Sequence, residues 1–187
     1  MLAAPPTNGC VTNAPQSFGT EFSMIRASLH FRLDLTDAGG DPRGGLHAHV
    51  ALGVLQEQAG GGVSSLGEEF PRANLSLDVV EIANSLSAPG SYYILTCGCG
   101  FHECARVYQP IDVRHTRSRI VWHIPGGDAG YHVNATAVSF DRSAYRDEIT
   151  RLAALLHSTQ PTSIVCYYHN SFERVLASMK NAIDASL

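Results

Sequence analysis

Hydrophobic and polar residues alternate along residues 23–35, "SMIRASLHFRLDL". The mostly polar set of alternate positions holds Met24, Arg26, Ser28, His30, Arg32 and Asp34. The apolar set holds Ile25, Ala27, Leu29, Phe31, Leu33 and Leu35. A period of two with one apolar face predicts a half-buried β-strand. Residues 46–56, "LHAHVALGVLQ", predict a second strand with His47 and His49 on one face, and residues 57–73 predict a long loop.

Three segments have the spacing of an amphipathic helix. The first spans residues 76–90, where Ser76 is a plausible N-cap for a stripe of Val79, Ile82, Ala83 and Leu86. The second begins at Asp141, an acidic cap, and its apolar stripe is Tyr145, Ile149, Leu152, Ala153 and Leu156. The third begins at Asn170 or Ser171, and its stripe is Phe172, Val175, Leu176, Met179 and Ile183.

The middle of the chain has a different pattern. Residues 92–96, "YYILT", predict a strand, and residues 107–124 predict a β-hairpin whose turn lies near Thr116–Arg119. Residues 131–140 predict a further strand. The order of these elements predicts an α+β fold, with a central antiparallel sheet, helices packed on one side and a Cys-rich turn at a strand end. We expect a flexible N-terminal arm at residues 1–20 and a single domain over residues 21–187.

Composition narrows the class of protein. The chain has 187 residues and a formal net charge of -4, which gives no basic footprint for nucleic acid and favours a basic protein partner. The first 20 residues lack the apolar core of a signal peptide, and no run reaches the roughly 18 apolar residues of a membrane span. We therefore expect a cytoplasmic protein that binds neither membrane nor nucleic acid, in a compartment that disfavours disulfides.

The densest chemistry lies in residues 91–104, "SYYILTCGCGFHEC". Cys97, Cys99 and Cys104 have the spacing C-x-C-x4-C, and Gly98 and Gly100 lie between them. Residues i and i+2 of a strand point to the same side, and glycine permits a positive φ that can turn the chain back. Three sulfur atoms can then converge on one point, which is the geometry that tetrahedral zinc requires.

A closed zinc site needs a fourth ligand. His115, on the predicted hairpin, is the first choice, His102 inside the loop is its competitor, and His123 is third. A Cys3His site would be structural, because it leaves no open position for water. Buried thiols, or a disulfide or redox couple, are the alternatives to zinc. Cys10 and Cys166 show no relation to this cluster.

Three further groups of residues can serve binding. Arg114, Arg117 and Arg119 crowd the predicted hairpin tip, where they can contact an anionic partner or form a solvated turn. The pairs Tyr92–Tyr93 and Tyr167–Tyr168 place one ring on each face of a strand, which can leave aromatic contact surface. His47 and His49 can be metal ligands or solvent-facing polar positions.

The segment "YYILTCGCGFHECA", followed by "VRH", "VWHI" and "SFDRSAYRDEI", resembles a poorly characterised group of bacterial proteins with a TCxCGxxxCA signature. The resemblance covers about residues 75–157 and implies a small bacterial α+β domain. Such sequences often carry glycine where this chain has His102 and Glu103, which makes His102 a less attractive ligand. Some proteins of this type look like immunity proteins that neutralise polymorphic toxins.

These observations give three hypotheses for function. The leading one is a non-enzymatic protein-binding domain with a structural zinc site at Cys97, Cys99, Cys104 and His115, in the concrete form of an immunity protein that neutralises a bacterial toxin. The second is a zinc-dependent hydrolase, in which water takes one metal position. The third is a thiol or zinc redox sensor, in which these cysteines oxidise reversibly.

Overall fold

The structure is a computed structural model that describes residues 24–37, 46–57, 63–65, 75–97, 100–127, 130–131, 134–164 and 172–187. The predicted features outside these residues are the N-terminal arm, Cys10, Cys99, Cys166, Tyr167, Tyr168, Asn170 and Ser171. None of the helices in the described ranges is long and apolar enough to cross a membrane.

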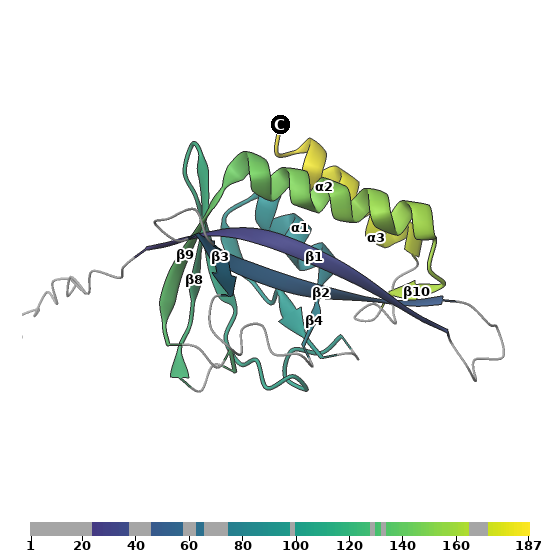
Figure 1. Cartoon of the computed structure of the whole chain (residues 1–187), viewed down its shortest axis with the longest axis horizontal. Helices are drawn as coiled ribbons and strands as arrows, with labels where there is room; N and C mark the ends of the chain where they lie inside the picture. The colour runs from purple at the N-terminus through teal and green to yellow at the C-terminus, as the bar shows by residue number, and fades with distance from the viewer. Residues whose placement is uncertain are drawn as a thin grey trace, which may run out of the picture.

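The described strands form a larger and a smaller sheet (Figure 1). They are β1 (Ile25–Asp37), β2 (Leu46–Glu57), β3 (Val63–Ser65), β4 (Ser76–Leu77), β5 (Gly90–Tyr92), β6 (Leu95–Thr96), β7 (Ile111–His115), β8 (Arg119–Ile124), β9 (Thr136–Asp141) and β10 (Ser163–Ile164). The larger sheet has the order β10-β2-β1-β9-β8-β7-β5, β3 pairs with β2, and β4 and β6 form the smaller sheet. The pairings are antiparallel except for β1 with β9 and β10 with β2.

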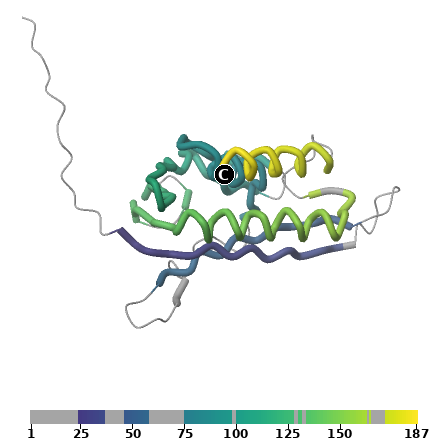
Figure 2. Tube along the Cα trace, turned by 90° about the horizontal axis from the view of Figure 1, so that it is seen from above, coloured from purple at the N-terminus to yellow at the C-terminus, as the bar shows by residue number. Residues whose placement is uncertain are grey.

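Three helices cover one side of this sheet: α1 (Val79–Ser87), α2 (Arg142–Thr159) and α3 (Phe172–Asp184). Figure 2 shows α2 directly over the layer of β1 and β2, with α1 and α3 on the same side and farther from that layer. The α+β class, with a mostly antiparallel sheet and helices on one side, is therefore confirmed.

The alternation along β1 has the predicted consequence. Ala27, Leu29 and Phe31 are buried under the helices, while His30 and Arg32 are exposed. β1 pairs with β2 over a long register, from Ala27 opposite Gln56 to Asp37 opposite Leu46. The hairpin of β7 and β8 is also as predicted, since the Thr116 N–H donates to the Arg119 carbonyl oxygen at 2.9 Å.

Three local predictions need correction. Helix α1 begins at Val79, and its cap is Asp78, whose carboxylate accepts the N–H groups of Val80 and Glu81 at 3.0 Å each. Ser76 is instead in β4, opposite Thr96. A carboxylate at Asp78 satisfies two helix N–H groups, so the chain uses it as the cap and keeps the preceding residues extended.

The predicted strand at residues 92–96 is divided. Gly90–Tyr92 pair with β7 in the larger sheet, whereas Leu95–Thr96 pair with β4 in the smaller one. Cys97 therefore follows a short strand and does not belong to it. The predicted loop at residues 57–73 also contains a strand, because Val63–Ser65 pair with the end of β2.

Candidate functional site

The segment after β6 forms a compact loop, which we call the Cys loop and define as Cys97 and Gly100–Gln109 in the described residues. Gly100 donates its N–H to the Cys97 carbonyl oxygen at 2.9 Å and has a φ of 83°. The positive φ that the sequence predicts for glycine in this segment is therefore present at Gly100.

His102 and Val107 hold the two sides of the Cys loop together, and we call this pair of residues the neck of the loop. The Val107 N–H donates to the His102 carbonyl oxygen at 2.9 Å, and His102 Nδ1 lies 3.0 Å from the Val107 carbonyl oxygen. A carbonyl oxygen can only accept, so Nδ1 carries the proton and donates. The imidazole also stacks on Tyr93, with 3.5 Å between ring centroids and 14° between ring planes. The stack thus holds the loop against the end of β5, and the two hydrogen bonds hold the two sides of the loop together.

The far end of the Cys loop is fastened by residues 130–131. The Tyr131 hydroxyl donates to the Gln109 carbonyl oxygen at 2.8 Å, and burial raises the pKa of this buried tyrosine. Gly130 has a φ of 95°, and a Cβ there would overlap the Arg106 carbonyl oxygen. Arg106 itself has a φ of 59°, which is uncommon for a residue with a side chain. Only glycine at position 130 allows this close approach of the two backbones.

Glu81 of α1 accepts a hydrogen bond from Tyr93, the residue on which His102 stacks. Its Oε2 accepts the Tyr93 N–H at 3.3 Å. Burial, and then the nearby charge of Asp78, raise the pKa of the Glu81 carboxyl group, while the Tyr93 N–H and His102 act in the opposite direction. His102 therefore has a carboxylate on the helix side, and its Nε2 lies 3.3 Å from Glu103 on the solvent side.

The predicted zinc ligands do not come together in the described residues. Cys97 is disulfide-bonded, and Cys104, the other described cysteine, is an exposed free thiol. A sulfur atom in a disulfide supplies no thiolate to a metal. No group of three or more His, Cys, Asp and Glu side chains within the described ranges could hold a metal ion. Because Cys99 lies outside these ranges, zinc binding stays a prediction.

His115, the predicted fourth ligand, lies away from Cys97. Its Nε2 is 2.8 Å from the Ser85 carbonyl oxygen near the end of α1, so Nε2 carries a proton and donates. The register of β5 with β7 pairs Gly90 with Val113 and Tyr92 with Ile111. His115 therefore continues past the Gly90 end of β5, whereas Cys97 follows the opposite end.

The other histidines lie on strands. His123 is half-buried in β8, opposite Ala137 and Asp112, rather than facing open solvent. His47 and His49 are half-buried on the same face of β2, as the alternation predicts. None of these three belongs to the neck contacts of the Cys loop.

Two aromatic side chains stand out on the Cys loop. Phe101 is 55% exposed and Tyr108 is 59% exposed. Phe101 directly precedes His102, and Tyr108 directly follows Val107. Because His102 and Val107 are hydrogen-bonded to each other, both aromatic residues lie next to the neck of the loop. The sequence pattern indicated neither residue, because Phe101 lies among the cysteines and Tyr108 lies at the start of the predicted hairpin of residues 107–124. The usable signal was two large aromatic residues close to the cysteine cluster.

These residues define an α+β domain with one fastened loop that carries exposed aromatic side chains. Searches of family models, of curated proteins and of solved structures gave no match to this chain. The resemblance to the bacterial proteins with the TCxCGxxxCA signature therefore stays a prediction.

Proposed function

We propose that this chain is a non-enzymatic protein-binding domain and that its contact surface is the Cys loop. The observation that carries the proposal is the exposure of Phe101 and Tyr108 on a loop fastened at both ends. Aromatic residues supply large contact areas and are enriched among residues that dominate binding energy. Exposure of this kind costs solubility, and a partner surface that covers both rings offsets that cost.

The fastening of the loop supports the same proposal. Binding normally orders side chains and loops, and this ordering lowers the affinity. Here the His102–Tyr93 stack, the Tyr131–Gln109 hydrogen bond and the Gly130 contact already hold the backbone. The Cys loop can therefore dock with little further loss of conformational entropy.

The proposed partner is a basic protein, because the chain has a net charge of -4. An immunity protein bound to a bacterial toxin is the concrete form of this proposal, and the resemblance of residues 75–157 supports it. In that form, docking of Phe101 and Tyr108 would cover or distort the toxin's active surface. No metal is needed for this mode of binding.

Thiol-based redox sensing is a second candidate, favoured by one observation. Cys97 is disulfide-bonded, while Cys104 in the same loop is a free, exposed thiol. Two-electron reduction of the Cys97 disulfide by a cellular dithiol, which is itself oxidised to a disulfide, would give two thiols, and we expect this change to weaken partner binding. A partner affinity that is the same before and after reduction would exclude this role.

The test compares two double variants of the full chain as bait in the native host. Phe101→Ser with Tyr108→Ser removes the proposed contact surface. Leu35→Ser with Leu46→Ser removes similar exposed apolar side chains at the far end of the β1–β2 hairpin, where they are 41% and 40% exposed. We expect a basic protein to be retained by wild type and by the Leu35/Leu46 variant and lost by the Phe101/Tyr108 variant. The purified partner should then bind with at least about tenfold lower affinity to the Phe101/Tyr108 variant. Equal retention by all three chains contradicts the proposal.

A further inference from the structure

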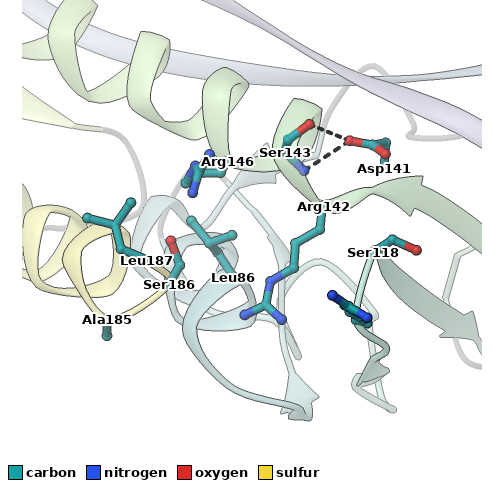
Figure 3. Close-up of a pocket in the computed structure, with 10 residues that line it drawn as sticks. Leu86, Ser118, Asp141, Arg142, Ser143, Arg146, Ala185, Ser186 and Leu187 are labelled. Atoms are coloured by element: carbon teal, nitrogen blue, oxygen red, sulfur yellow. Dashed lines mark hydrogen bonds between the residues drawn. The ribbon is translucent and has the colours of Figure 1, made fainter.

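A basic pocket lies where α2 begins, away from the Cys loop (Figure 3). Its volume is about 490 Å³. α1 contributes Leu86, the β7–β8 turn contributes Arg117 and Ser118, and residues 185–187 after α3 close another side. Arg142 and Arg146 come from α2, and in Figure 3 the Arg142 side chain reaches into the space between Leu86 and Ser118.

Some arginines of the described residues outside this pocket are paired with a carboxylate, and those in the pocket are not closely paired. Arg32, Arg114 and Arg151 each have a carboxylate oxygen within 3.1 Å. Among the described residues, the Arg117 and Arg142 side chains have no ion pair, and Arg146 reaches only Asp147, at 3.9 Å. The pocket therefore collects cations that the protein itself leaves largely uncompensated.

The one side-chain carboxylate in the pocket, that of Asp141, already accepts hydrogen bonds from the protein. Asp141 Oδ1 accepts the Ser143 hydroxyl at 2.6 Å and the N–H groups of Ser143 and Ala144 at 3.0 and 3.1 Å. These hydrogen bonds, with that of the Ser143 hydroxyl first, lower the pKa of Asp141, so it stays ionised. Three arginines, this aspartate and the terminal carboxylate of Leu187 give the lining a net charge of +1.

The position of Arg142 and Arg146 on α2 makes the net positive charge of the pocket less favourable still. Arg142 is the first residue of α2, and Arg146 is one turn later on the same side of the helix. Cations at a helix N-terminus oppose the helix dipole, and like charges four residues apart repel. An anion in the pocket would relieve both effects together.

We propose that this pocket binds the dianionic phosphoryl group of a small phosphate ester. A planar guanidinium matches two oxygens of a phosphoryl group at once, and the three oxygens of a dianionic phosphoryl group can engage more than one of the three arginines. The volume is in the range of small-molecule sites and leaves room beyond one phosphoryl group. Leu86 supplies an apolar wall for the organic part of the ligand.

The test titrates the full chain with inorganic phosphate, phenyl phosphate and benzoate at constant ionic strength, by calorimetry and amide chemical shifts. We expect saturable binding of phenyl phosphate, weaker binding of inorganic phosphate and no saturation by benzoate. Shifts should centre on residues 117–118, 141–146 and 185–187. Arg142→Gln with Arg146→Gln should weaken phenyl phosphate binding by about tenfold or more.

The matched control is Arg26→Gln with Arg32→Gln, which removes the same charge from the exposed face of β1. This control should keep the affinity within about twofold. Equal affinity for inorganic phosphate and phenyl phosphate would identify free phosphate as the source of the phosphoryl group. No saturable binding of either, or an equal loss in both double variants, would overturn the proposal. Because the Phe101/Tyr108 variant leaves this pocket intact, failure here is separate from failure of the proposed protein binding.

Discussion

His102 and Tyr93 stack with their ring centroids 3.5 Å apart, and this contact joins the Cys loop to the end of β5. His102 Nδ1 also donates to the Val107 carbonyl oxygen at 3.0 Å. The His102 side chain therefore holds the loop by a stack and by a hydrogen bond. The rigidity of the proposed binding surface depends on these two contacts.

Substitution His102→Ala should loosen the Cys loop. The lost stack and hydrogen bond together are worth about 1–2 kcal/mol. We expect the amide protons of Ala105 and Val107 to exchange at least about tenfold faster, and those of β8 to keep their rates. Glu103→Ala, which removes only an exposed contact to His102 Nε2, is the matched control. Unchanged exchange at Val107 in the His102 variant would show that another contact holds the loop.

Ser85 and Tyr145 should respond unequally to substitution. Their side-chain oxygens are 2.7 Å apart in the core, and Ser85 Oγ donates to the Ile82 carbonyl oxygen. Tyr145 therefore donates to Ser85, and Ser85→Ala leaves a buried hydroxyl without its acceptor, at a cost of about 1–3 kcal/mol. Tyr145→Phe leaves Ser85 bonded to Ile82 and should cost about 0.5–1.5 kcal/mol. Denaturant unfolding measures both variants, and a larger loss for Tyr145→Phe would contradict this assignment of the proton.

Glu81 and Glu148 should give opposite dependences of stability on pH. Burial, followed by Asp78, raises the pKa of Glu81 above 4.5, so its ionisation destabilises the fold as the pH rises past 4.5. The hydrogen bond from Arg151 lowers the pKa of Glu148 below 4.5, so its ionised form stabilises the fold until the pH falls through that lowered value.

Glu81→Gln should therefore raise the free energy of unfolding at pH 7, whereas Glu148→Gln should lower it. The difference for Glu81→Gln should shrink as the pH falls toward 4.5, and that for Glu148→Gln should shrink as the pH falls from 4.5 through the lowered pKa of Glu148. Unfolding in denaturant at pH 7 and pH 3.5 measures the change. The prediction for Glu81 fails if the Gln variant is less stable than wild type at pH 7.

The zinc hypothesis makes a redox-dependent prediction. Zinc at Cys97, Cys99, Cys104 and His115 requires Cys97 as a thiolate, and the disulfide excludes that state. Non-reduced protein should hold no zinc, while reduced protein dialysed against zinc should hold one ion per chain by elemental analysis. Cys97→Ser or Cys99→Ser should abolish that zinc, with Cys10→Ser as the control. Absence of zinc from the reduced wild type would remove the metal site from the account.

Much of the fold can be predicted from local patterns of apolar and polar residues. Alternation predicts which residues of β1 are buried, and the 3.6-residue spacing predicts α2 and the buried Val175 and Met179 of α3. These predictions succeed because each element buries one face against the same core. The cap at Ser76 fails because Ser76 pairs with Thr96 in β4, so the helix begins two residues later and Asp78 caps it.

The candidate site was harder to predict, because its contacts join residues that are distant in the sequence. The partner of His115 is the Ser85 carbonyl oxygen, 30 residues away, and nothing in the spacing of the cysteines indicates that bond. The same holds for Tyr131 with Gln109 and for the arginines that meet at the start of α2. The glycine turn at Gly100 was predictable, since positive φ is a local property of the residue.

The central claim is that the Cys loop binds a partner protein through Phe101 and Tyr108. Photo-crosslinking in the native host tests it most directly, with p-benzoylphenylalanine in place of Tyr108 in one chain and in place of Leu35 in another. The account predicts one discrete protein adduct from position 108, lost when Phe101→Ser is added, and no such adduct from position 35. No adduct from position 108, or the same adduct from both positions, would contradict the claim.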